Sequence, residues 1–197
     1  MTGRDHMIAN ISTTAVLADI SFILKNYEGR NGLIKMFADI NEKGMPYFTS
    51  DSCIRNGIIF LFLSLMCFII GTFLPDADSR TSVMGRIIHL PGGHRTWTHS
   101  AYTCLLWLFV GYNFHPFMWL FLAHFLHVFY DSLSRGGVCW FLPFTGYRKF
   151  GNSGAKIKNG HFWGYRVGTW SEYGLIICLI MTAVFTTYIT IKAEGIL

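Results

Sequence analysis

The sequence is poor in charged residues, which occupy 14% of its 197 positions, against roughly 25% in an average soluble domain. Hydrophobic residues supply 52% and aromatic residues 17%. This composition argues against an ordinary soluble domain and predicts a small polytopic membrane protein. At about 150 residues per domain, the length fits one membrane-embedded domain over 1–197.

Cysteine is scarce and shows no motif. The five cysteines are odd in number, widely spaced and mostly set within apolar runs. This pattern predicts neither a disulfide framework nor a CxxC metal motif. The start of the chain also lacks a signal-peptide pattern, because Asp5 stands beside Arg4 and Asp19 interrupts the apolar stretch that follows. We therefore expect no cleavable signal peptide.

Two apolar segments have the length of a membrane span. Residues 56–75 form 20 positions without a charge, and residues 173–191 form 19 more. Both are close to the roughly 20 residues that cross a bilayer core. Residues 7–24 are less apolar, and we expect them to span only if they pack against other helices.

A third apolar run, 96–130, holds 35 residues without Asp, Glu, Lys or Arg. One straight helix of that length would measure about 52 Å, well beyond the ~30 Å hydrocarbon core. Gly111, Asn113 and Pro116 are helix breakers near its middle. The run therefore predicts a helical hairpin, with arms near 101–110 and 117–130, in an all-α multi-pass bundle.

The remaining segments are polar and interfacial. Residues 25–55 form a polar connection or insertion, in which Leu33 to Ile40 recur at helical spacing; a helix on the membrane surface and a plain loop helix are both open. Residues 132–172 form an interfacial loop region with basic and aromatic residues interleaved. Beside a membrane, such residues favour a lipid-headgroup belt over nucleic-acid binding.

The hairpin sets the topology. It places the start of the chain, 76–99 and 132–172 on one side, with ten Lys and Arg, and 25–55 and the last residues on the other, with six. By the positive-inside rule the first side is cytoplasmic. The candidate metal ligands all fall on that side: His6, Asp76, His94, His99, His124, His127 and Asp131.

Spacing within three polar motifs points to metal chemistry. His127 and Asp131 are four apart, so they share a helix face, and His124 lies on the same stripe as a ligand or as a core histidine. Asp76 and Asp78 in LPDADS are either ligands or a helix cap. Mixed imidazole and carboxylate shells suit zinc, manganese or iron.

The HRTWTHS motif, 94–100, adds the remaining candidates. His99 is the favoured ligand at the helix entry, and His94 is a second candidate in the loop. Arg95 is either an anion-binding group or an interfacial anchor. Thr98 or Ser100 is expected to cap the following helix. Glu172 fits a capping box that starts with Thr169, and it is also a candidate general base.

The chain resembles the YdjM-type family of bacterial inner-membrane proteins, described as membrane-bound metal-dependent hydrolases and often linked to LexA regulation. GRDHMIAN, LPDADS, HRTWTHS, HVFYDSLSRGGVCWFLPF and GTWSE carry the resemblance, in the family's order. The order of His and Asp residues is more loosely similar to that of the zinc-dependent phospholipase C and single-strand nuclease superfamily. The resemblance implies that His6, Asp76, His99, His127 and Asp131 are ligands, with Asp78 and Glu172 nearby.

We therefore expect a hydrolase at the cytoplasmic face of the inner membrane that uses zinc, as one or more ions, to attack a phosphoester or lipid phosphate. Asp78 or Glu172 would accept the proton and Arg95 would stabilise negative charge. Two rivals stay open. One is a haem protein with His99 and His127 as axial ligands. The other is a membrane partner or transporter with a structural metal.

Overall fold

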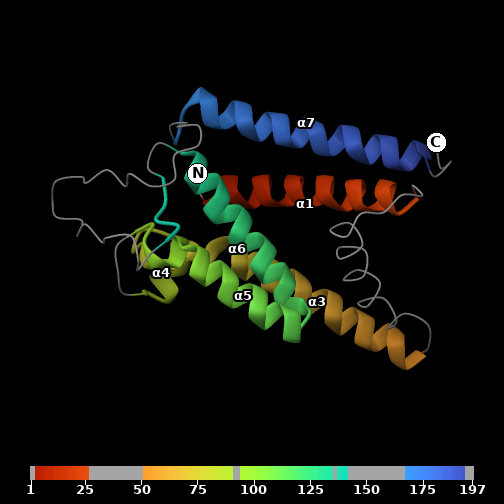
Figure 1. The fold of residues 1–197 in the computed structure, drawn as a ribbon, viewed down its shortest axis with the longest axis horizontal. Coiled ribbons are helices and arrows are strands. Elements are labelled where there is room, and N and C mark those ends of the chain that lie inside the picture. The colour runs from red at the N-terminus through yellow and green to blue at the C-terminus, as the bar shows by residue number, and fades with distance from the viewer. Residues whose placement is uncertain (1–2, 27–50, 91–93, 135–136, 142–166, 194–197) are drawn as a thin grey trace. The chain divides into compact units, whose positions relative to one another are not determined.

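The computed structural model describes residues 3–26, 51–90, 94–134, 137–141 and 167–193. Every regular element within these ranges is a helix (Figure 1), which confirms the all-α prediction for the described part of the chain. Most of the predicted polar connection 25–55, including the helical pattern from Leu33 to Ile40, and most of the interfacial region 132–172 lie outside the described residues.

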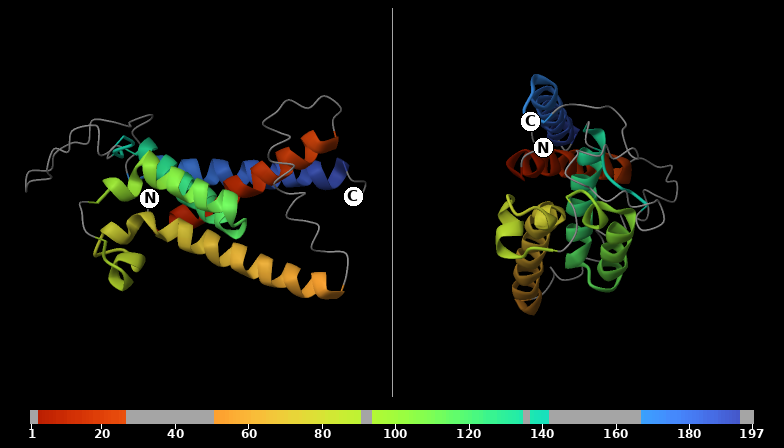
Figure 2. Two further views of the ribbon diagram at one scale, coloured as in Figure 1. Left: turned by 60° about the horizontal axis from the view of Figure 1, so that its bottom comes forward. Right: turned by 90° about the vertical axis from the view of Figure 1, so that its left-hand side faces the viewer.

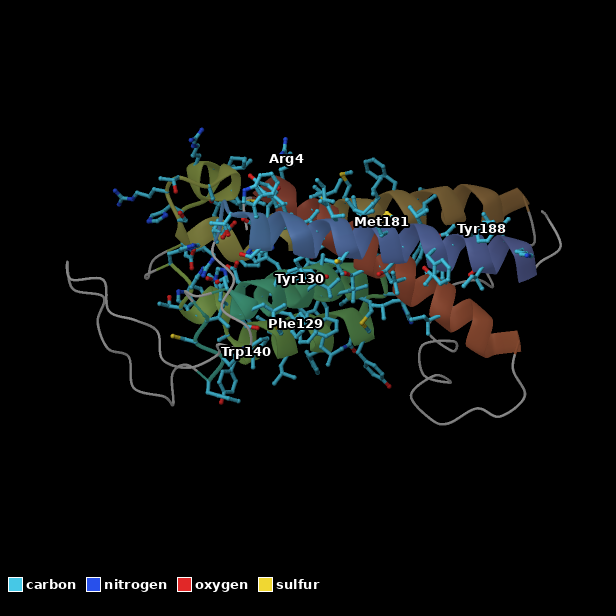
Figure 3. The ribbon with its side chains drawn as sticks, turned by 90° about the horizontal axis from the view of Figure 1, so that it is seen from above. Arg4, Phe129, Tyr130, Trp140, Met181 and Tyr188 are labelled. Atoms are coloured by element: carbon cyan, nitrogen blue, oxygen red, sulfur yellow. The ribbon has the colours of Figure 1, made fainter. Side chains whose placement is uncertain are left out.

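Three long helices coincide with the predicted apolar segments. They are α1 (Gly3–Asn26), α3 (Asp51–Phe73) and α7 (Trp170–Ala193). Among the described residues, one helix, Trp170–Lys192, is both long and apolar enough to cross a membrane by itself, and α3 contributes a shorter apolar stretch, Ile59–Phe73. The exposed apolar side chains of α7 include Met181 and Tyr188 (Figure 3). The multi-pass arrangement remains a prediction.

The middle run folds as the predicted hairpin. Helix α5 (Ala101–Asn113) has Phe114 as its C-cap, and α6 (Pro116–Leu133) returns beside it (Figure 2). Gly111 permits the close approach, because a Cβ there would lie 2.8 Å from the Met118 backbone nitrogen. With 13 residues at ~1.5 Å each, α5 is about 20 Å long and too short to cross a ~30 Å core.

Short helical turns connect α3 to the hairpin. They are the 3-10 turn η2 (Pro75–Asp78), helix α4 (Val83–Ile87) and the 3-10 turn η3 (Trp97–His99). The Ser100 hydroxyl accepts a hydrogen bond from the Thr103 amide, so Ser100 caps α5 as predicted. Gly71 lets α3 pack directly on α6, since a Cβ there would lie 2.5 Å from the Leu120 carbonyl oxygen.

The chain forms two compact units. One comprises 1–7 and 62–173, and it holds every candidate site residue named above. The other comprises 8–61 and 174–197. Within this second unit, the Asp19 carboxylate accepts hydrogen bonds from the hydroxyls of Thr186 (2.8 Å) and Thr187 (2.9 Å), which ties α1 to α7. Asp19, the charged residue within the apolar segment 7–24, therefore has polar partners.

Candidate metal centre

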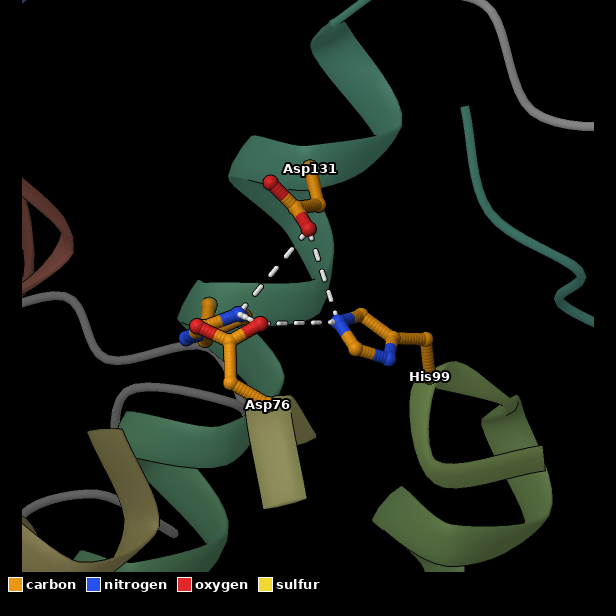
Figure 4. A group of neighbouring side chains, drawn as sticks. Asp76, His99 and Asp131 are labelled. Atoms are coloured by element: carbon orange, nitrogen blue, oxygen red, sulfur yellow. Dashed lines mark ion pairs between the residues drawn. The ribbon is translucent and has the colours of Figure 1, made fainter. Parts of the chain in front are cut away.

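Four side chains from three elements meet in one buried cluster. Asp76 comes from η2, His99 from η3 and Asp131 from α6 (Figure 4). His127 also comes from α6. One ligand atom from each lies within 4.8 Å of the other three. His99 Nε2 is 3.4 Å from Asp131 Oδ2, and His127 Nε2 is 3.6 Å from Asp76 Oδ1. The predicted hairpin is what brings His99 and Asp131 together.

These spacings suit a shared cation. Ligand atoms at about 2.1 Å from a tetrahedral zinc ion lie about 3.4 Å apart. The Nε2 atoms of His99 and His127 are buried and have no hydrogen-bond partner among the described residues, although carboxylate oxygens lie within 4.0 Å of each. Two imidazole nitrogens without such a hydrogen-bond partner therefore converge with two carboxylates on one point. We conclude that the four residues fit a divalent metal.

In His99 and His127, contacts to Nδ1, the ring nitrogen that faces away from the cluster, orient the imidazole. His127 Nδ1 lies 2.6 Å from the Thr72 carbonyl oxygen, which can only accept, so Nδ1 carries the proton. His99 Nδ1 lies 3.0 Å from Thr98 Oγ1 and 3.5 Å from Asp78 Oδ2. Both rings thus point Nε2 toward the cluster, where each could bind a metal through that nitrogen once it is unprotonated, which is the usual arrangement of histidines that bind metals.

Charge within the cluster is strongly coupled. Burial alone would lower the pKa of His99, but Asp131 and Asp78 outweigh it and raise the pKa to about 9. Burial alone would raise the pKa of Asp76, but His127 and His99 outweigh it and lower the pKa to about 2. The carboxylates therefore hold a proton on His99 when no cation is bound, and a metal ion would replace that positive charge.

Asp76 and Asp78 have different tasks because a 3-10 helix has three residues per turn, so side chains two apart point to different sides. Asp78 accepts hydrogen bonds from the Arg95 amide (3.0 Å) and the Thr98 hydroxyl (2.5 Å), and lies 2.9 Å from His94 Nδ1. Burial opposes ionisation, but the bonds from His94 and His99 hold its pKa well below the usual range. Asp78 orients His99 from behind.

Arg95 supports the cluster from one side. Its backbone has a φ of 63°, a conformation rare for residues other than glycine. The guanidinium donates to Asp131 Oδ1 (3.0 Å) and to the Ser134 hydroxyl (2.7 Å). It therefore balances a buried carboxylate and holds it in place, while its predicted role toward an anionic substrate stays a prediction.

The remaining candidates lie at varying positions. His6 Nε2 is 3.2 Å from Asp131 Oδ1, and its ring stacks on His127 at 3.7 Å, so it adjoins the four-residue cluster. His94 is partly exposed and faces Asp78. His124 is buried, and its Nε2 lies 3.0 Å from the Thr98 carbonyl oxygen, which fastens η3 to α6.

Glu172 is buried at the start of α7, where its carboxylate accepts the Gly168 amide at 2.5 Å. This is a cap-like bond made one residue before the expected Thr169. Sequence reasoning missed three supporting groups, the Thr72 carbonyl, the Thr98 hydroxyl and the Ser134 hydroxyl. The hydroxyls in HRTWTHS were a signal for Thr98, whereas a backbone carbonyl gives none.

Comparison with known proteins identifies the family. No curated protein and no solved structure matches the chain. The sequence model of a family described as YdjM inner membrane protein matches residues 53–195, a range that contains the four-residue cluster and leaves out His6. The match covers well over half of the chain, so the chain belongs to the YdjM inner membrane protein family, whose description indicates an inner-membrane location.

Proposed function

We propose that the chain is a membrane-embedded, metal-dependent hydrolase that acts on a phosphoester, with a lipid phosphate as the favoured substrate class. The observation that carries the proposal is the pair of buried, unsatisfied Nε2 atoms, on His99 and His127, that face the carboxylates of Asp76 and Asp131. When bound, a divalent ion such as zinc would activate a water molecule and polarise the scissile bond.

The chain's own residues would divide the work. His99, His127, Asp76 and Asp131 would hold the ion, with His6 as the adjoining ligand for a wider shell. Asp78 orients His99, and Arg95 compensates the charge of Asp131. Glu172 remains the proposed proton acceptor, because the carboxylate of Asp78, the other predicted acceptor, already contacts His94, Arg95 and Thr98. The mixed nitrogen and oxygen set favours a divalent ion over haem, since axial haem ligation needs no carboxylate.

Exposure indicates where a substrate would arrive. The Asp76 side chain is 16% exposed, whereas those of His99, His127 and Asp131 are exposed by 2% or less. A substrate would therefore reach the cluster beside Asp76. The membrane family and the net charge of +5 favour a substrate that is both membrane-bound and anionic.

Turnover in a bilayer tests this function. The purified protein, in lipid nanodiscs with zinc or manganese, would be incubated with phospholipids, lipid phosphates and soluble phosphoesters, and the products identified by mass spectrometry. We expect metal-dependent hydrolysis that Asp131→Asn abolishes and that His115→Gln, an exposed histidine on the hairpin turn, leaves intact. Stoichiometric metal with no turnover of any substrate would instead support a structural metal, and a Soret band would support haem.

A further inference from the structure

The segment 79–90, which directly follows the ligand-bearing turn η2, exposes aliphatic side chains. It contains α4, and Val83, Ile87 and Ile88 are 65%, 74% and 55% exposed. Val83 and Ile87 are four apart and share one face of the helix. Three large aliphatic side chains grouped on this small lobe, residues 79–90, are typical of an interaction surface.

Charge on this lobe has one sign. Arg80, Arg86 and His89 are exposed, and residues 79–90 contain no Asp or Glu. Arg80 Nε donates to His89 Nε2 at 3.4 Å, so these two side chains lie side by side. An apolar tip flanked by arginines is the pattern of elements that rest in a membrane interface, with acyl chains below and anionic headgroups around.

The lobe is fixed to the metal cluster's own turn. The Ser82 hydroxyl donates to the Asp76 carbonyl oxygen at 2.6 Å, and the Leu90 amide donates to the Ala77 carbonyl oxygen at 3.0 Å. Gly85 packs so closely that a Cβ would lie 1.9 Å from the Ser79 carbonyl oxygen. The lobe is therefore held directly against the turn that carries Asp76.

We infer that residues 79–90 form a docking surface for the anionic face of a lipid bilayer, with Val83, Ile87 and Ile88 among the acyl chains and Arg80 and Arg86 on lipid phosphates. A protein partner is less favoured, because a stable interface needs about 800 Å² from each side and this lobe is a single short turn. The inference rests on the lobe's own side chains and holds whether or not the cluster is hydrolytic. With the proposed function, it would place lipid phosphates beside Asp76.

Photo-crosslinking tests the docking surface. Full-length protein with Ile87→p-benzoylphenylalanine would be irradiated in nanodiscs of phosphatidylcholine and phosphatidylglycerol, and adducts would be weighed by intact mass spectrometry. We expect lipid adducts in which phosphatidylglycerol exceeds its share of the bilayer by at least about threefold, since one basic residue near an anionic surface contributes about fivefold. Arg80→Gln with Arg86→Gln should return the adducts to the bilayer composition.

Arg4→Gln is the matched control, because Arg4 is exposed but lies outside the lobe, and the adduct ratio at position 87 should not change. Elution as a single species would show that each variant is folded, and Ile88→p-benzoylphenylalanine provides a second probe. Protein adducts in place of lipid adducts would overturn the inference in favour of a protein partner. Absence of any adduct, or adducts at the bilayer composition with both arginines present, would also overturn it.

Discussion

The role of Asp78 gives the sharpest test of how the cluster is held. Asp78→Asn keeps the size of the side chain and replaces one carboxylate oxygen with an NH₂ donor. The NH₂ group can replace Oδ2, which accepts from the Arg95 amide and the Thr98 hydroxyl, or Oδ1, which lies 2.9 Å from His94 Nδ1. If the NH₂ group takes the place of Oδ2, it meets the Arg95 and Thr98 donors. In either orientation, His99 Nδ1 loses the anion 3.5 Å away.

We expect zinc affinity to fall by about 10–100-fold, the usual cost of losing a partner that orients a metal-binding histidine. This corresponds to roughly 1.4–2.7 kcal/mol. The measurement is a competition titration of the detergent-purified protein against a chromophoric chelator, with His115→Gln as the control. Wild-type affinity in folded Asp78→Asn would refute the claim that Asp78 orients His99. Complete loss of metal from the folded variant would make Asp78 a ligand.

Three further predictions use the same preparation. His99 has a pKa of about 9 in the fold against 6.5 for the free side chain, so at pH 7.5 zinc must displace its proton. Calorimetry in two buffers should show about one proton released when zinc binds. The affinity for zinc should rise with pH up to about pH 9. A pH-independent affinity would contradict this. Gly71→Ala should cost about 1–3 kcal/mol and lower the thermal midpoint through the clash with Leu120, whereas Gly174→Ala, with nothing within 4 Å, should not. His124→Gln should lower the thermal midpoint but retain stoichiometric metal, because His124 bonds the Thr98 carbonyl; loss of metal from the folded variant would make it a ligand.

The sequence predicted the features that depend on local pattern. Gly111 and Pro116 interrupt a run too long for one helix, and the hairpin follows from them. The spacing of His127 and Asp131 requires one helix face. In the hairpin, His99 at the start of one arm lies near Asp131 at the end of the other. His99 Nε2 and Asp131 Oδ2 are 3.4 Å apart.

The division of labour among the candidates could not be predicted. Asp76 and Asp78 are the same residue type in the same short motif, and the geometry of the 3-10 turn decides which of them faces the cluster. The part played by His124 depends on the position of η3, which is set by tertiary packing. His6 reaches Asp131 from a helix more than a hundred residues away in sequence, and no local pattern specifies that contact.

Metal content is the most direct measure of the central claim, that Asp76, His99, His127 and Asp131 bind one divalent ion. Elemental analysis would compare detergent-purified wild type with His127→Ala, Asp131→Ala and the control His115→Ala, each shown to be folded by its elution as a single species. The account predicts stoichiometric metal in the wild type and the control, and less than a tenth of that in the two cluster variants. Wild-type stoichiometry in His127→Ala and Asp131→Ala would contradict it.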